Sequence, residues 1–294
     1  MSTIKSLSVG HGDMFYVVHN SDNFSIIDCC IPQDRSDEII DELKDQSADK
    51  GCTRFISTHP DEDHLRGIQR LDETMSLTNF YCVKNATTKE DESDDFKHYC
   101  QRRDDGHAFH IKRGCTRKWI NQTDDKRGSA GIRIIWPIVD NPFYEEALEK
   151  AEGGESPNNI SAVIRYTLND GGTALWMGDL ETDFMENIAD AITWPKTDIV
   201  FAPHHGRASG RIPHAILRQL KPKIIVLGEA PSRDLHYYGG YHTLTQNSAG
   251  DLIFEYETGK IHIYCSDPGY EADFLDQEEG GAAEGLNYLG TLEV

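Results

Sequence analysis

A string of polar side chains follows an apolar run at 54–58 and limits what this chain can fold into. The string is HPDEDH at 59–64, and its potential metal ligands are His59, Asp61, Asp63 and His64. The run RFIST before it predicts a short buried strand. Along an extended chain, side chains two positions apart point the same way and neighbours diverge, so this loop can supply ligands to two adjacent ions.

Two further groups of polar residues follow predicted strands. Asp179 ends the apolar run in LWMGDL, where a helix begins and where an acid also serves as a helix cap. His204 and His205 follow the run FAP and precede Gly206, which lets the backbone pass close to another group. The other polar residues at predicted strand ends are His11, Asp13, Asp28, Asn158, Asn159 and Ser161. The sequence therefore offers a set of ligands that are distant along the chain.

The apolar periodicity predicts an α/β fold. Runs at 2–8, 14–18 and 24–28 suggest antiparallel strands, and helical spacing extends from 36 to about 50. Further strands are predicted at 79–84, 132–136, 160–168, 173–178, 198–203, 223–229, 251–257 and 260–265, with helices after 64, near 143–151 and near 213–220. Strands in two groups with helices between them suggest two sheets covered by helices. Without a fixed repeat or a Pro- or Ser-rich linker, we expect one domain over 1–265.

Two segments depart from this pattern. At about 85–131 the periodicity is lost, which predicts an insertion or a long excursion from the core. Within it, 97–127 holds nine Lys or Arg against four Asp. The segment 266–294 is acidic and has no Lys or Arg, and we expect it to be a solvated tail.

The overall charge bears on the partners. The chain has 29 Lys and Arg against 50 Asp and Glu, a formal net charge of −21, so a polyanion can approach only locally. The basic stretch offers such a place through Lys112, Arg113, Arg117 and Lys118, with aromatic residues nearby that can stack on bases. The alternative is that these cations pair with the acids at 91–95 and 124–125.

The sequence also bears on the compartment. An odd number of cysteines, seven, scattered from Cys29 to Cys265, is typical of free thiols in a reducing environment. There is no apolar stretch of about 18 residues and no signal-peptide pattern near the N-terminus. We therefore expect a cytoplasmic protein with no membrane contact.

The order of these motifs resembles the metallo-β-lactamase superfamily, and in particular the soluble hydrolase domain of ComEC-type DNA-uptake competence proteins. The resemblance covers nearly the whole chain apart from 85–131 and the tail. It is carried by LSVGHGD (7–13), IIDCC (26–30), STHPDEDHLRG (57–67), PNNISAVIRY (157–166), LWMGDL (175–180), FAPHHGRASG (201–210) and TQNSAGDLIFE (245–255).

The resemblance implies an αββα sandwich with two metal ions at one edge. His59 and Asp61 would bind the first ion, Asp63 and His64 the second, with Asp179 bridging and His205 completing the second site. Two features depart from many superfamily members. Asp61 stands where they have a His, and the region of Asn158, Asn159 and Ser161 offers no further imidazole, as in the competence proteins. Arg207 also replaces the usual Ser after HHG.

This residue set suggests a mechanism. Carboxylates in place of imidazoles favour Mn²⁺, with Zn²⁺ or Mg²⁺ as alternatives. Two ions about 3.5–4 Å apart can supply hydroxide and neutralise a phosphoryl group, which suits phosphodiester hydrolysis. We expect Asp63 to orient or deprotonate the nucleophile and His204 or a metal-bound water to protonate the leaving oxygen. Arg207, Asn159 and Ser161 are expected to contact the substrate.

The leading hypothesis is therefore a metal-dependent nuclease acting on DNA, and two alternatives stay open. One is a hydrolase of a small ester, lactone, thioester or cyclic nucleotide, which would not need a basic stretch. The other is a degenerate binding subunit that contacts a protein or DNA through 85–131 or the tail, and it should carry no stoichiometric metal. The sequence leaves the oligomeric state open.

Overall fold

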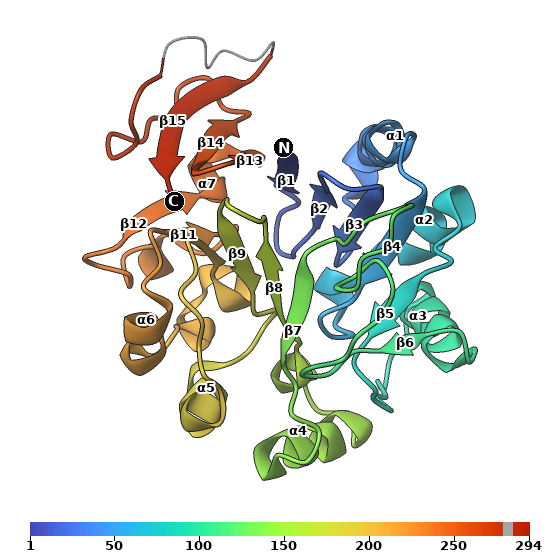
Figure 1. Ribbon diagram of the computed structural model, residues 1–294. Helices are drawn as coiled ribbons and strands as arrows, with labels where there is room; N and C mark the ends of the chain where they lie inside the picture. The colour runs from blue at the N-terminus through green and yellow to red at the C-terminus, as the bar shows by residue number, and fades with distance from the viewer. Residues whose placement is uncertain (279–284) are drawn as a thin grey trace.

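Two mixed β-sheets form the centre of the computed structural model, with helices around them (Figure 1). The structure describes residues 1–278 and 285–294. The larger sheet has nine strands in the order β15-β14-β13-β1-β2-β3-β4-β5-β6, and the smaller has six in the order β12-β11-β10-β9-β8-β7. The expected α/β class with two sheets is confirmed at this level.

The strands of the larger sheet are β1 (Ser2–Ser6), β2 (Phe15–Val18), β3 (Asn23–Ile27), β4 (Cys52–Ile56), β5 (Phe80–Cys82), β6 (Phe109–His110), β13 (Leu252–Glu257), β14 (Lys260–Cys265) and β15 (Asn287–Glu293). Those of the smaller sheet are β7 (Ile132–Trp136), β8 (Val163–Thr167), β9 (Thr173–Trp176), β10 (Ile199–Phe201), β11 (Ile224–Leu227) and β12 (His242–Thr245). The helices are α1 (Ser36–Ser47), α2 (Ile68–Met75), α3 (Asp94–Asp104), α4 (Pro142–Glu152), α5 (Thr182–Ile188), α6 (His214–Leu220) and α7 (Gln246–Ala249).

Strand direction places several strand ends together. In the larger sheet, β3, β4, β5 and β6 are parallel, whereas β1, β2, β13, β14 and β15 are joined by antiparallel pairing. In the smaller sheet, β9, β10, β11 and β12 are parallel. Since the carboxyl ends of parallel strands lie at the same edge of a sheet, the loops after β3 and β4, and those after β9 and β10, emerge together.

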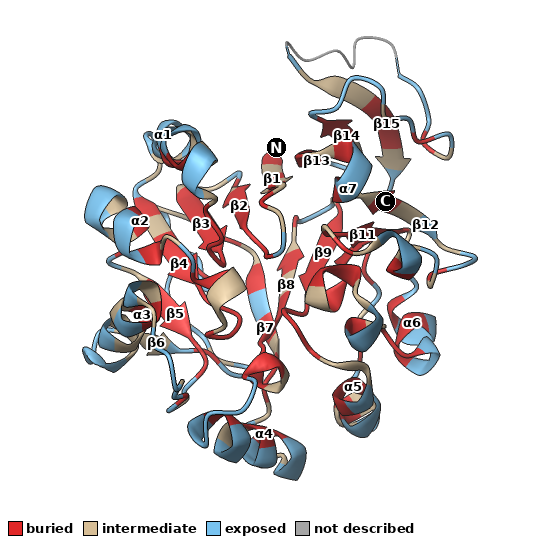
Figure 2. Cartoon of the chain, turned by 180° about the vertical axis from the view of Figure 1, so that it is seen from behind, coloured by how far each residue is buried: buried red, intermediate tan, exposed pale blue. Residues whose placement is uncertain are grey.

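Aromatic side chains join the two sheets. Phe15 on β2 lies edge-on to Trp176 of β9 and to Phe201 of β10, with ring centroids 6.0 and 4.8 Å apart. Phe254 on β13 likewise meets Phe201 at 5.8 Å. Such pairs add specific geometry to the burial of large apolar surfaces. The strands are accordingly the most buried part of the chain, and the helices expose their outer faces (Figure 2).

The outer helices follow from local sequence. In α1, Ile39, Ile40 and Leu43 recur at helical spacing, and all three are buried in a core cluster that includes Phe24 and Ile26 of β3. Side-chain caps fix the starts of two other helices. Ser93 Oγ accepts from Phe96 N at the start of α3, and Asn141 Oδ1 accepts from Phe143 N at the start of α4.

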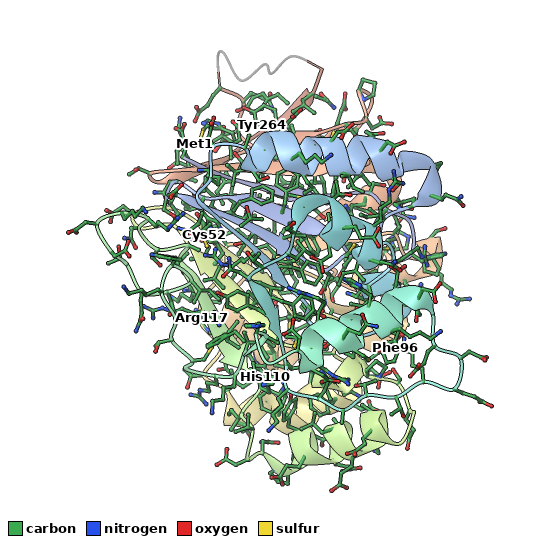
Figure 3. All side chains as sticks on the ribbon, turned by 90° about the vertical axis from the view of Figure 1, so that its right-hand side faces the viewer. Met1, Cys52, Phe96, His110, Arg117 and Tyr264 are labelled. Carbon is green, nitrogen blue, oxygen red and sulfur yellow. The ribbon has the colours of Figure 1, made fainter. Side chains whose placement is uncertain are left out.

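The segment 85–131 is more ordered than we expected. It contains α3 and β6, and β6 extends the larger sheet by pairing with β5. Phe96 on α3, labelled in Figure 3, is fully buried, as are Tyr99 and Ile120. Part of this segment therefore belongs to the core, and the prediction of an excursion away from it is wrong. Its few apolar residues are spaced among charges, which hid them from a periodicity argument.

The acidic segment after Cys265 also differs from the expected solvated tail. β15 pairs antiparallel with β14 and forms an edge of the larger sheet, while Leu275 and Leu289 are buried. The acids of this segment are residues 267, 271, 273, 276, 278, 279, 284 and 293, of which 279 and 284 lie outside the described residues. Among the helices that the structure describes, none is long and apolar enough to cross a membrane.

Candidate metal centre

Side chains from four distant segments meet at the edge where strands of both sheets end. One ligand atom from each of Asp13, His64, Asp179 and His205 lies within 4.8 Å of the others. Asp13 precedes β2, His64 follows β4, Asp179 follows β9, and His205 follows β10. The predicted gathering of His64, Asp179 and His205 is thus present in the structure. Three of the four side chains are essentially buried, which is unusual for charged groups unless they are paired or bind an ion.

Asp179 lies between the two imidazoles. Its Oδ1 is 3.0 Å from His64 Nε2, and its Oδ2 is 3.5 Å from His205 Nε2. Asp63 approaches from the solvent side, with Oδ2 3.3 Å from the same nitrogen of His205. The His59 ring packs on the His64 ring with centroids 4.2 Å apart. Asp179 thus contacts two of the ligands predicted for the second ion, His64 and His205.

Two carboxylates fix the orientation of the imidazoles from behind. Asp28 Oδ2 accepts from His64 Nδ1 at 2.9 Å and from the Thr58 hydroxyl at 2.6 Å. Asp13 Oδ1 accepts from His205 Nδ1 at 2.9 Å. A carboxylate that binds one ring nitrogen turns the other toward the centre and raises its basicity, as is usual for metal-binding histidines.

Several inward-facing atoms lack a hydrogen-bond partner of good geometry within the described part of the chain. They are Nε2 of His59, Nε2 of His64 and Oδ1 of Asp179. Buried polar atoms are rarely left unsatisfied, because each costs roughly 1–3 kcal/mol. Two imidazole nitrogens and a carboxylate oxygen are the donor atoms of a first-row divalent metal ion, so the residues present fit such an ion.

The charges of the cluster are strongly coupled. Burial alone would lower the pKa of His64 and raise that of Asp179, but their mutual attraction reverses both, so the pKa of His64 is raised and that of Asp179 is lowered. For His205, Asp13 and Asp179 outweigh burial and raise the pKa to about 10. Burial and the neighbouring His64 lower the pKa of His59 to about 3. Without metal, protons on His64 and His205 balance the buried carboxylates.

Asp61 does not join the cluster. Its Oδ1 accepts from the backbone N–H of Glu62 at 2.9 Å and from Lys89 Nζ at 2.8 Å. It thereby caps the short 3₁₀ turn at Glu62–His64, which is a common use of Asp. In the described residues, no hydrogen bond or ion pair joins Asp61 to His59, its predicted partner at a first ion. The sequence could not reveal this, because Lys89 is 28 positions away.

The loop after β10 has an uncommon backbone. His204, His205 and Gly206 all have positive φ, at 53°, 56° and 89°. Non-glycine residues adopt this region only where the surroundings impose it, and such residues cluster at functional sites. His204 remains beside the cluster, with Nε2 3.6 Å from Asp179 Oδ2 and Nδ1 2.9 Å from Ser209 Oγ. It is a neighbour of the centre, as expected.

Asn159 and Ser161, which we expected to contact substrate, hold the loop after β9 instead. Ser161 Oγ accepts from Asp179 N at 3.0 Å. The Asn159 side chain accepts from Glu181 N at 3.0 Å and donates to the Glu181 carboxylate at 2.8 Å. These bonds position Asp179 and occupy polar atoms that a substrate would need. The positive φ of Gly178 also keeps this turn close to Ser161, where a Cβ would lie 2.6 Å from Oγ.

The predicted substrate-binding cations of the basic stretch are Lys112, Arg113, Arg117 and Lys118. In the described residues, no hydrogen bond or ion pair joins Lys112, Arg113, Arg117 or Lys118 to the cluster. Arg117 stacks on Phe109 and Tyr81, with its guanidinium 4.7 and 5.3 Å from the ring centroids. Arg207, two positions after His205 in the HHG loop, has a buried Nε without a partner among the described residues.

The roles of Asp13 and Asp28 went unrecognised in the sequence. Both stood out only as acids at strand ends, and neither was assigned a contact. The signal was present: Asp13 directly precedes the apolar run MFYVV, and Asp28 ends the run SII. The sequence does not show which imidazole each carboxylate faces, because the partner of Asp13, His205, is 192 positions away.

Comparison with known proteins identifies no relative. The sequence matches no protein-family model, and no curated protein is significantly similar to it.

Proposed function

We propose that this protein is a metal-dependent phosphodiester hydrolase, most specifically a nuclease that acts on DNA. The observation that carries the proposal is the convergence of two buried imidazole nitrogens, Nε2 of His64 and Nε2 of His205, on the Asp179 carboxylate at the strand ends. The two mixed sheets with outer helices are compatible with the αββα sandwich of the metallo-β-lactamase superfamily, and we propose that fold assignment with the function.

The proposed ligands of the ion are His64, Asp179 and His205, with Asp63 at the solvent side. A mixture of imidazoles and carboxylates favours Mn²⁺, with Zn²⁺ and Mg²⁺ as alternatives. When bound, such an ion lowers the pKa of a coordinated water and neutralises charge on a phosphoryl group. Asp13 and Asp28 would keep the two imidazoles in the tautomer that presents Nε2.

Two residues at the mouth of the cluster are suited to move protons. The Asp63 side chain is 22% exposed, so it can reach a water that approaches from solvent. The interaction with His205 outweighs burial and keeps the pKa of Asp63 below its usual value, so Asp63 is ionised and can orient that water. His204 lies on the other side of Asp179, 14% exposed, with Nδ1 hydrogen-bonded to Ser209. Its Nε2 would donate a proton to the leaving oxygen.

The pattern of ion pairs favours a polyanionic substrate. Several cations of the basic stretch have acidic partners within 4 Å: Lys97, Arg102, Arg103 and Arg127. Among the described residues, no such partner is found for Lys112, Arg113, Arg117 and Lys118. Arg113 also lines a cavity of about 400 Å³ together with Arg133. Unpaired cations in a chain of charge −21 mark where a phosphate backbone would be attracted.

A small-molecule substrate is the second candidate, because one pocket is lined by Glu181, two positions after Asp179. It measures about 190 Å³ and is lined by Asn159, Glu181, Phe143 and Phe184 among others. Its acids would repel a phosphate backbone and accept a neutral or cationic group. Turnover of cyclic nucleotides or chromogenic esters at rates above that of DNA would favour this reading.

The test is a nuclease assay on purified protein. Labelled single- and double-stranded DNA and RNA are incubated with Mn²⁺, Mg²⁺, Zn²⁺ or chelator. We expect metal-dependent cleavage of DNA that is lost in Asp179→Ala and His205→Ala and kept in the exposed control Asp34→Ala. No cleavage of any nucleic acid with any of the three metals would reject the nuclease. Asp179→Ala protein that cleaves as fast as wild type would reject this centre as its site.

A further inference from the structure

Lys89 pairs with Asp61, one of the residues predicted to bind a first metal ion. Its Nζ is 2.8 Å from Asp61 Oδ1 and 3.5 Å from Glu62 Oε1. The ammonium group also lies 5.0 Å from the ring centroid of Phe96, which is fully buried on α3 (Figure 3). Only 15% of the Lys89 side chain is exposed. A lysine so covered, with two carboxylates and an aromatic face around it, has a defined position.

The chain on both sides of Lys89 is anchored. Before it, Thr88 Oγ1 donates to the carbonyl of Glu152 at the end of α4, 2.8 Å away. After it, Ser93 Oγ donates to the Glu62 carboxylate at 2.9 Å. Asp95 then accepts from the backbone N–H of Gly67 at 2.7 Å, next to the start of α2. Hydrogen bonds thus fix the chain at Thr88, before Lys89, and at Ser93 and Asp95, after it.

Lys89 competes with a metal ion for a ligand of the predicted first site. Asp61 Oδ1 is used by Lys89 and by the Glu62 backbone N–H. The other ligands predicted for that site are the bridging Asp179 and His59, whose Nε2 has no partner among the described residues. A second divalent cation there would share the Asp61 carboxylate with an ammonium group, which would repel it.

We propose that Lys89 supplies the positive charge of the missing second ion, so that the centre binds a single divalent metal. This inference deepens the proposed function and rests on its metal centre. An ammonium group can neutralise Asp61 and attract a phosphoryl oxygen, but it does not lower the pKa of a water as a divalent ion does. The single ion at His64, Asp179 and His205 then accounts for all activation of water.

The experiment is a titration of the full chain with Mn²⁺ alone. Free Mn²⁺ is followed by electron paramagnetic resonance, and the bound metal is then quantified after gel filtration. Wild-type protein is expected to bind one equivalent tightly. Lys89→Met, which keeps the length of the side chain and removes its charge, is expected to bind two. The double variant Lys89→Met with Asp61→Ala is expected to return to one.

Two control variants distinguish the effect of the Lys89 charge from a general effect of substitution on the fold. Lys89→Arg keeps the charge and should bind one equivalent. Lys97→Met removes an exposed lysine of α3, paired with Asp94, and should also bind one. Two equivalents in the wild type would overturn the inference, as would one equivalent in folded Lys89→Met. If Lys89→Met does not fold, Lys89→Gln takes its place. The wild-type titration alone would still overturn the proposal if it gave two equivalents of bound Mn²⁺. The titration uses no substrate, so its result does not depend on whether the protein cleaves DNA. Wild-type protein that binds no Mn²⁺ would reject the metal centre itself.

Discussion

Asp13 accepts a hydrogen bond from Nδ1 of His205, 2.9 Å away across 192 positions of sequence. The bond sets which nitrogen of the imidazole carries the proton, and so leaves Nε2 facing Asp179 and Asp63. It connects the turn before β2 in one sheet to the loop after β10 in the other. The metal centre therefore depends on how the two sheets are placed against each other.

Removal of the Asp13 carboxylate should weaken metal binding. We expect Asp13→Ala to lower the Mn²⁺ affinity about 10–100-fold, the usual effect of losing a partner behind a ligating histidine. Asp13→Asn keeps an acceptor and should lose less. The dissociation constant is measured by isothermal titration calorimetry, with exposed Asp34→Ala as the control. Unchanged affinity in Asp13→Ala would show that His205 needs no orienting partner.

Asp28 is expected to matter for stability. It is buried and accepts from Thr58 N, from the Thr58 hydroxyl and from His64 Nδ1. Asp28→Ala leaves these donors without a partner and an imidazolium without one of its counter-charges, so the free energy of unfolding should fall by about 3–5 kcal/mol. Urea unfolding in the presence of chelator measures this, again against Asp34→Ala. A loss below about 1 kcal/mol, the scale of an ordinary hydrogen bond, would contradict the assigned role.

The titration of His19 should contribute to the pH dependence of the free energy of unfolding. Burial, together with Arg54 and Lys50, lowers the pKa of this histidine well below 6.5. Between about pH 6.5 and that lower value the unfolded chain binds a proton that the folded chain does not, so stability falls as the pH falls, by up to about 1.4 kcal/mol per pH unit.

The matched variant isolates that group. His19→Gln keeps a side chain able to bond with Ser25, the present partner of His19 at 2.8 Å, but it does not titrate. Urea unfolding from about pH 5 to about pH 7.5 with chelator should therefore give a shallower slope in His19→Gln than in wild type. The exposed His236→Gln should leave the slope unchanged. Equal slopes in all three proteins would mean that His19 is not the group responsible.

The unpaired cations should control the salt dependence of DNA binding. Lys118→Ala, without an acidic partner in the described residues, is expected to weaken binding and reduce the log–log salt slope by about 0.9 for a lost phosphate contact. Lys97→Ala removes a cation paired with Asp94 and should change neither. Fluorescence anisotropy with a labelled duplex over a range of salt concentrations, in Ca²⁺ to prevent cleavage, gives both slopes. Identical behaviour of the two variants would place the substrate elsewhere.

The sequence predicted the regular elements well where apolar residues repeat. The strand RFIST and helix α1 appear where their periodicity places them, within two or three residues at each end. Periodicity did not reveal α3 or β15, because their buried residues are few and lie among charges. Pairing of β15 with β14 is a tertiary contact that local propensity does not encode.

The metal centre was also predicted only in part, because some of its contacts are tertiary. His64, Asp179 and His205 follow strands whose ends meet, so strand order brings them together. The partners of Asp61, Asn159 and Ser161 could not be read from spacing, since each depends on which loop lies against it. Polar residues at strand ends thus identified the place, and the packing of loops decided which of them face the centre.

The central claim is that His64, Asp179 and His205 bind a divalent ion together. Anomalous diffraction at the manganese edge from a crystal soaked in Mn²⁺ tests it most directly. The account predicts one peak about 2.0–2.2 Å from Nε2 of both histidines and from the Asp179 carboxylate. A well-ordered cluster with no anomalous peak at these atoms would contradict it.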